Sequence, residues 1–415
     1  MNLRTLKSRR ARLRRLPTPA LFLLAALAAE LVDELVDGAT GAAWPSLRSD
    51  LSLNYVQVGL LLGIPAVFAN LLEPALGFLA DAGRRRWLIV GGGLCFAAAL
   101  LLVAAATGFW PLLLALLLFY PASGAFVSLT QAALMDADPA RHEQNMACWA
   151  LAGSVGNLGG PLLVSLAAAL GGGWRPVFVG LAGLALVALA LLWSVRAQLD
   201  PSVQSSPDSS VSGPLSNPLP DTFRAGWQGL RAALSRSQIR RSLLLLECAD
   251  LMLDIFRGFV ALYFVDAVGA SAAQAGLAVI VLTGVGLIGD VLIVPVLERV
   301  SGVAYVRLSA AGVAVTFAAF LVVPQMGVKL ALLGVLGLLT SGWYAVLQAR
   351  LYTLLPAQSG TVMALGSVSA VLAGVVPIVL GGLAQQFGVQ VALWALLLGP
   401  LALLLGLPRA SLKRE

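Results

Sequence analysis

The chain has 415 residues, of which 59% are hydrophobic and only 11% are charged. A soluble domain is closer to half apolar and a quarter charged, so this composition excludes a soluble globular protein. The net charge of +7 does not indicate binding to nucleic acid, because the basic residues are distributed as the loops of a membrane protein require.

Hydrophobic stretches recur along the whole chain, and a membrane-spanning helix needs about 20 mostly apolar residues. We therefore expect an all-α polytopic membrane protein with twelve transmembrane helices, arranged as two six-helix pseudo-symmetric bundles. The expected spans are residues 18–43, 54–80, 87–107, 111–135, 144–170, 177–195, 242–266, 275–297, 304–323, 330–353, 361–385 and 391–407.

The basic residues predict the orientation of these spans. Residues 1–17 are rich in arginine, and we expect this N-terminus to contact anionic lipid headgroups in the cytoplasm. Nearly all the other Lys and Arg residues then also lie inside, apart from Arg48, Arg175 and Lys329 outside and Arg257 within a span. This positive-inside bias predicts a multi-pass protein of the inner or plasma membrane, with both termini cytoplasmic.

A Pro- and Ser-rich stretch divides the chain at residues 200–221. Such a composition forms no packed core, so we expect a cytoplasmic linker over residues 196–241. The linker separates an N-terminal bundle, residues 18–195, from a C-terminal bundle, residues 242–407. Residues 408–415 are the expected cytoplasmic tail.

The two expected bundles are repeats of each other. Adding 217 to a residue number in the first bundle gives a related residue in the second, without an insertion. The matched pairs include Glu30 and Glu247, Asp33 and Asp250, Asp37 and Asp254, Gln57 and Gln274, Glu73 and Asp290, and Gln131 and Gln348. Parallel six-helix repeats are one of the main designs of membrane transporters, so this repeat predicts a transporter.

Acidic residues mark one face of the first and of the seventh expected span. The residues are Glu30, Asp33 and Asp37 in the first span, and Glu247, Asp250, Asp254 and Arg257 in the seventh. At about 100° per residue, each set covers less than a quarter of the helix circumference. A charge at the bilayer centre costs at least ~2.5–3.5 kcal/mol, so neither face points toward lipid. The stripes differ in one respect, since Thr40 stands where Arg257 would have its counterpart.

We expect the two stripes to line a central cavity that binds a small-molecule solute and couples its movement to protons. Crowding and removal from water both favour the protonated form of a carboxylate, which suits proton carriage. Polar contacts between helices are the alternative role of these acids. Glu73 and Asp290, in the second and eighth spans, and Gln131 and Gln348, in the fourth and tenth, complete the predicted cavity.

The segment GFLADAGRRR lies in the predicted cytoplasmic loop after the second span. It resembles the signature loop of the major facilitator superfamily, Gly-x-x-x-Asp-Arg-x-Gly-Arg-Arg, although Ala82 replaces the first Arg of that pattern. The matching residues are Gly77, Asp81, Gly83, Arg84 and Arg85. The resemblance implies the major facilitator fold, in which this loop is a charge-linked latch at the cytoplasmic gate of an alternating-access cycle.

The fifth expected span contains the pattern Gly156-x-x-x-Gly160-Pro161. It is similar to the antiporter signature of the drug-efflux branches, although small residues at this spacing also allow close helix packing. The stretch LVDELVDGATGAAWPSLRSDLSLNYVQVGLL resembles fosmidomycin-resistance-type efflux proteins. The fourth span lacks the Arg that many proton-coupled members carry, and Arg257 is a candidate substitute.

These features predict a secondary active transporter that exports a small organic, cationic or drug-like solute in exchange for protons. Three alternatives stay open: import by the same fold, a receptor or assembly factor that does not transport, and transport of metal cations by carboxylate ligands. No P-loop, nucleophile elbow or HExxH motif occurs, so we do not expect an enzyme. We expect a monomer with no cofactor, no resident metal and no nucleic-acid partner.

Overall fold

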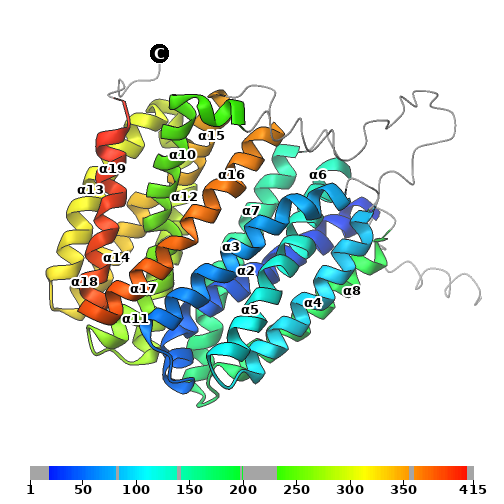
Figure 1. Cartoon of the computed structure of the whole chain (residues 1–415), viewed down its shortest axis with the longest axis horizontal. Helices are drawn as coiled ribbons and strands as arrows, with labels where there is room; N and C mark the ends of the chain where they lie inside the picture. Colours follow the sequence, from blue (N-terminus) through cyan, green and yellow to red (C-terminus); the bar gives the residue numbers. More distant parts are fainter. Residues whose placement is uncertain are drawn as a thin grey trace, which may run out of the picture.

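The computed structural model describes residues 18–80, 84–137, 142–196, 199, 231–354 and 359–408. Across these residues the chain forms helices joined by short loops and no β-sheet, which confirms the predicted all-α class (Figure 1). The helices of the first half are α2 (Thr18–Asp50), α3 (Tyr55–Leu79), α4 (Arg85–Ala105), α5 (Phe109–Ser123), the π-helix η2 (Gly124–Ser128), α6 (Leu129–Ala137), α7 (His142–Ala169) and α8 (Arg175–Ser194).

The second half follows the same pattern with more interruptions. Its elements are α10 (Ser237–Asp250), the π-helix η6 (Leu251–Ile255), α11 (Phe256–Asp266), α12 (Ala272–Arg299), α13 (Gly302–Val322), α14 (Met326–Thr340), α15 (Trp343–Leu354), α16 (Ser359–Ala373), α17 (Val375–Phe387), α18 (Val389–Trp394), the short 3₁₀-helix η7 (Ala395–Leu397) and α19 (Leu398–Gly406). Figure 1 shows the two halves side by side, the first in blue to green and the second in green to red.

Among the described residues, ten helices are long and apolar enough to cross a membrane. Two further helical segments are long enough but carry the acidic stripes: α2, with 33 residues, and the continuous run of α10, η6 and α11. The acids lower the hydropathy of these two segments and exclude them from the apolar set. The count of twelve spans therefore stays a prediction, which requires that both acid-bearing helices cross the membrane.

Helices α3 and α12 begin in the same way, at positions 217 residues apart. At α3, the side chain of Asn54 accepts from the Gln57 backbone, and the Gln57 side chain accepts from the Asn54 backbone. Ser271 and Gln274 form the same capping box at the start of α12. Such reciprocal hydrogen bonds satisfy backbone N–H groups at a helix start, so the sequence repeat is also a repeat of local structure.

The two halves contact each other near one end of the bundle. We call the helix ends that lie with Thr18 and Pro408 the termini side, and the opposite ends the far side. Helix α3 packs against α16 and α17, α7 packs against α12, and α2 packs against α11. A Cβ atom at Gly59 would lie 2.3–2.4 Å from a backbone oxygen of the other half, as would one at Gly63. Backbones therefore touch directly between α3 and the second half.

A polar cluster ties the halves together at the far side. Arg48, at the end of α2, forms a 2.6 Å ion pair with Asp266, at the end of α11. The Tyr55 hydroxyl donates to the same carboxylate, and the Arg48 guanidinium lies 4.4 Å from the centre of the Tyr55 ring. The Tyr55 backbone N–H donates to Gln385 at 3.0 Å. We call Arg48, Tyr55, Asp266 and Gln385 the far-side cluster.

Lys329, expected on the outside, lies near the start of α14 on the far side, where it is buried with 3% of its surface exposed. Its ammonium group donates to the Tyr263 hydroxyl and to the Phe320 carbonyl, both at 2.6 Å. It also lies 5.0 Å from the centres of both aromatic rings. Hydrogen bonds and aromatic faces thus compensate for the burial of this cation.

Candidate functional site

Close packing of α7 on α2 positions the first acidic stripe. A Cβ atom at Gly156 would lie 2.5 Å from the Leu31 carbonyl oxygen, and one at Gly160 would lie 2.3 Å from the Ala39 nitrogen. No larger residue fits at either place without moving a backbone. The glycines of the antiporter-like pattern therefore have a packing role here, and they place the acidic face of α2 directly against α7.

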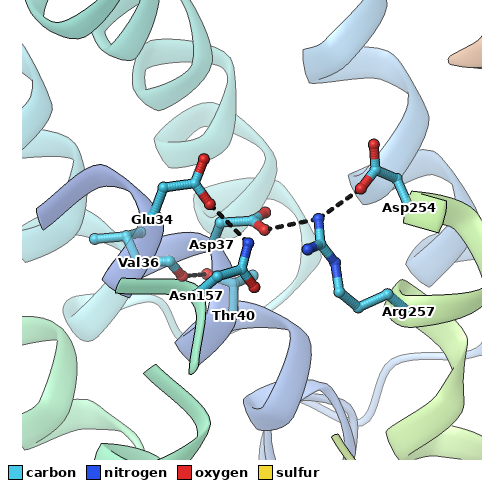
Figure 2. A network of polar contacts seen from close by, with 7 residues as sticks. All are labelled: Glu34, Val36, Asp37, Thr40, Asn157, Asp254 and Arg257. Carbon is cyan, nitrogen blue, oxygen red and sulfur yellow. Dashed lines mark hydrogen bonds and ion pairs between the residues drawn. The ribbon is translucent and has the colours of Figure 1, made fainter. Parts of the chain in front are cut away.

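Two acids of α2 receive hydrogen bonds from other helices of the first half. The Ser123 hydroxyl, at the end of α5, donates to Asp33 at 2.8 Å. The Asn157 amide, between the two packing glycines of α7, donates to Glu34 at 2.7 Å (Figure 2). Sequence reasoning missed both donors, although the position of Asn157 inside the glycine pattern was an available signal.

Glu30 is the most enclosed acid of the first stripe, with 8% of its surface exposed. Trp149 of α7 lies within hydrogen-bonding reach of its carboxylate, and a Cβ atom at Gly153 would lie 2.7 Å from the same carboxylate. This acid therefore lies deep in the contact between α2 and α7.

Arg257 bridges the two halves at the centre of the molecule. One terminal nitrogen of its guanidinium lies 3.2 Å from Asp37 of α2 and 2.5 Å from Asp254 of η6 (Figure 2). The side chains of Asp37 and Asp254 are 55% and 61% exposed, whereas that of Arg257 is 25% exposed. Glu34 and Asp250 also lie within electrostatic range of the guanidinium. One cation thus faces four carboxylates, two of which are open to water.

Arg257 contacts both acidic stripes, although in the sequence it belongs to the second stripe alone. Arg257 was expected to belong to the second stripe, but it pairs with the first stripe as well. Thr40, at the corresponding position of α2, turns its hydroxyl onto the carbonyl of Val36 at 2.7 Å (Figure 2). The first half therefore supplies no equivalent cation, and the contact between the stripes is asymmetric.

The remaining acids of the second stripe have partners in their own half. The Ser369 hydroxyl of α16 donates to Glu247. Asp250 lies within hydrogen-bonding reach of Asp254. The stripe of the seventh helix therefore extends from α16 to the central bridge, along one face of α10 and η6.

The other predicted cavity residues lie away from Arg257 and its four carboxylates, which we call the central cluster. Asp290 accepts a 3.1 Å hydrogen bond from the backbone N–H of Gly342. Glu73 lies beside Gly124, where a Cβ atom would be 3.6 Å from its carboxylate. Whether these two acids contribute to a transport cavity stays a prediction.

The two predicted glutamines also differ from each other. Gln131 of α6 directs its amide toward the sulfur of Met146 at 3.7 Å. The amide oxygen of Gln348 in α15 is buried without a hydrogen-bond partner among the described residues. Of the two, only Gln348 thus has an unused buried acceptor.

The loop that resembles the superfamily signature is described in part. Asp81 and Gly83 lie outside the described residues, Gly77 lies near the end of α3, and Arg84 directly precedes α4. Arg85 forms a 2.5 Å ion pair with Asp136 near the end of α6. The described part of the motif therefore links the third and fourth membrane segments on the termini side.

Over the described ranges, no group of three or more His, Cys, Asp or Glu side chains is arranged to hold a metal ion. The acids of the central cluster are instead paired with Arg257 and Asn157, and Asp33 is paired with Ser123.

A bundle of two repeated halves, with ionisable groups where the halves meet, is the architecture of secondary transporters. The profile of the Major Facilitator Superfamily matches residues 26–252, and the chain belongs to this family. The family and the fold make the chain a membrane transporter rather than an enzyme. No curated protein sequence matches it.

Solved structures of this family share the fold along nearly the whole chain. A bacterial homolog of the human lysosomal transporter Spinster, in an inward-facing and occupied conformation, is 14% identical with a TM-score of 0.71, over 94% of this chain and 96% of its own. A D-xylose-proton symporter is 16% identical with a TM-score of 0.71, over 93% and 96%. The nucleoside transporter NupG is 16% identical with a TM-score of 0.68, over 94% and 97%. At these identities the comparison concerns the fold alone.

Proposed function

We propose that this transporter exports a small organic cation in exchange for protons, and that the contact between Asp37, Arg257 and Asp254 is its coupling site. The observation that carries the proposal is the bridge itself, because it joins the halves through a cation shared by two water-accessible carboxylates. Ionisable groups inside a membrane protein are costly and usually serve ion or substrate movement.

The charge balance of the cluster favours a cationic solute. Arg257 neutralises part of the negative charge of Glu34, Asp37, Asp250 and Asp254. The remaining negative charge attracts either protons or an organic cation, and the two compete for the same carboxylates. Such competition is the simplest way to exchange one for the other.

The bridge also connects binding to alternating access. A proton or a cationic solute on Asp37 weakens its attraction to Arg257, which is a contact between the halves. The relative position of the halves then depends on what the carboxylates hold. A bound proton or solute can shift the equilibrium between two conformations only if it interacts differently with each of them.

The experiment is ethidium uptake into liposomes that contain the purified protein. Ethidium is a permanent cation, so a pH gradient does not trap it by protonation. An exchanger accumulates ethidium when the liposome interior is acidic, because protons leave as the cation enters. Asp37→Asn and Asp254→Asn should each lower gradient-driven uptake by about tenfold or more, since a charge-assisted hydrogen bond is worth ~1.5–3 kcal/mol.

The matched control is Asp50→Asn, which makes the same change in the same helix. Asp50 pairs with Trp174 and Arg175 of its own half, so this variant should retain wild-type uptake. Two outcomes contradict the proposal: uptake driven only by an acidic exterior, which indicates symport, and full gradient-driven uptake by both Asp37→Asn and Asp254→Asn.

We further propose that the protein acts as a monomer of the inner or plasma membrane and that its termini side faces the cytoplasm. The excess of basic residues on that side supports this orientation. Cysteines introduced at exposed Trp87 on the termini side and Leu170 on the far side provide the test. In intact cells an impermeant thiol reagent should label position 170 and not position 87.

A further inference from the structure

The tenth membrane segment is broken near its middle. Helix α14 ends at Thr340, the backbone of Ser341 is extended, and α15 begins at Trp343. Gly342 has a φ of +71°, a left-handed conformation that favours glycine. Such a break removes helical partners from backbone groups, and in a membrane protein those groups need other partners.

Helices α12 and α13 provide these partners. Asp290 of α12 accepts from the Gly342 backbone N–H at 3.1 Å. Tyr305 of α13 donates its hydroxyl to the Ser341 carbonyl at 2.9 Å. The Ser341 hydroxyl donates to the Gly286 carbonyl of α12 at 3.0 Å. The break is therefore held in place by side chains from two neighbouring helices.

The two parts of the tenth segment pack against different helices. Helix α14 packs mainly on α12 and α13, whereas α15 packs mainly on α10 and also touches α13 and α16. Figure 1 shows the ends of α10, α15 and α16 together on the termini side. Their buried side chains, with Ala233 just before α10, form a hydrophobic cluster separate from the main core. Its buried members are Ala233, Ile239, Leu243, Leu351 and Leu365. The end of α15, at Leu351, thus packs in this separate cluster, whereas its start, at Trp343 and Leu347, packs in the main core.

The first half has an acid at the equivalent position but no break in the equivalent helix. Glu73, the repeat counterpart of Asp290, faces Gly124 at the start of η2. There the chain continues as a π-helix into α6, and Glu73 has no hydrogen-bond or ion-pair partner among the described residues. Capping of a broken helix by the acid is therefore specific to the second half, and Glu73 of the first half offers an internal comparison.

We infer that Asp290 is a positioning residue for transport: it holds the break at Gly342, so that α15 moves as a unit relative to α12 and α14 when the termini side opens and closes. The inference rests on transport by this fold, and it requires neither proton coupling nor a cationic solute. It assigns to Asp290 the role of a hydrogen-bond acceptor rather than that of a charge.

Electron paramagnetic resonance distances test the movement, in protein whose three native cysteines are replaced. Spin labels at exposed Trp87 of α4 and Ala349 of α15 report on α15. Labels at Trp87 and at exposed Val296 of α12 report on the rest of the second half. Asp290→Ala should broaden the first distance distribution and leave the second unchanged. Transport should fall about tenfold, the lower end of the range for the loss of a charged acceptor, because this hydrogen bond is exposed.

Conservative variants separate positioning from charge. Asp290→Asn keeps an acceptor oxygen, so it should restore the narrow 87–349 distribution and return transport to within about threefold of wild type. Tyr305→Phe should broaden the same distribution less than Asp290→Ala, and Glu73→Ala should change neither distance. The inference is overturned if Asp290→Asn keeps the narrow distribution yet transports no better than Asp290→Ala, or if Asp290→Ala leaves both distributions unchanged.

Discussion

The far-side cluster predicts how the resting conformation responds to the loss of one carboxylate. Asp266 belongs to the second half, and it accepts from Arg48 and Tyr55 of the first half. Asp266→Ala removes both contacts between the halves at once, without changing the core of either half. The variant should therefore shift the equilibrium toward states in which the far side is open.

The size of the shift follows from the two lost contacts. The ion pair is partly exposed, at 29% for Arg48 and 26% for Asp266, so it contributes about 0.5–1 kcal/mol. The hydrogen bond from Tyr55 to the carboxylate adds about 1.5–2 kcal/mol, as expected for a charged acceptor. A total of about 2–3 kcal/mol corresponds to a 30- to 150-fold change in the ratio of the two states.

Spin labels at exposed Leu170, directly after α7, and at exposed Phe387 of α17 measure this equilibrium, because both residues lie at the far side and in different halves. Asp266→Ala should raise the ratio of longer to shorter distances by about 30- to 150-fold. Asp50→Ala serves as the control, since Asp50 pairs only within its own half and should leave the distances unchanged. If Asp266→Ala also leaves them unchanged, the far-side cluster does not hold the halves together.

Two substitutions test the packing of the individual halves. Gly156→Leu should lower the thermal unfolding temperature by the equivalent of about 1–3 kcal/mol, because its Cβ would meet the Leu31 carbonyl; an unchanged temperature would show that α7 can move away from α2. Lys329→Met should destabilise the second half by about 1–3 kcal/mol, because it leaves the buried Tyr263 hydroxyl and Phe320 carbonyl without their shared donor. A stability equal to wild type, measured by the same thermal unfolding, would mean that water replaces the ammonium group.

The sequence predicted the parts of the site that depend on helical periodicity. The spacing of the acids in α2, and of those in α10 and η6, indicated that each set shares a face, and the cost of burying charge indicated that the face points inward. The repeat offset located the second stripe, and the matching capping boxes of α3 and α12 are consistent with that offset. These features depend only on helical periodicity or on the 217-residue repeat, so they can be predicted without knowing how the helices pack.

Features that depend on how helices meet were not predictable in this way. Arg257 and Asp37 are far apart in the chain, and only the packed halves bring them to 3.2 Å. The buried position of Lys329 depends on two aromatic rings supplied by other helices. The sequence does contain a signal for the break in the tenth segment, since Ser341 and Gly342 form a dipeptide typical of turns. It contains no signal for the hydrogen bond by which Asp290 caps this break.

The contact of α3 with the second half determines how readily the halves can separate. At Gly59 the backbones of α3 and α17 meet directly, and at Gly63 both the Gly374 carbonyl and the Ile378 side chain approach the glycine. The two glycines give a close fit but bury no side chain of their own, so their own hydrophobic contribution, at about 25 cal/mol per Å², is small. When the contact breaks, the Ile378 side chain leaves Gly63, whereas the glycines themselves have no rotamer to find again when it re-forms. The glycines thus make this seam of the molecule one that can open and close repeatedly at low energetic cost.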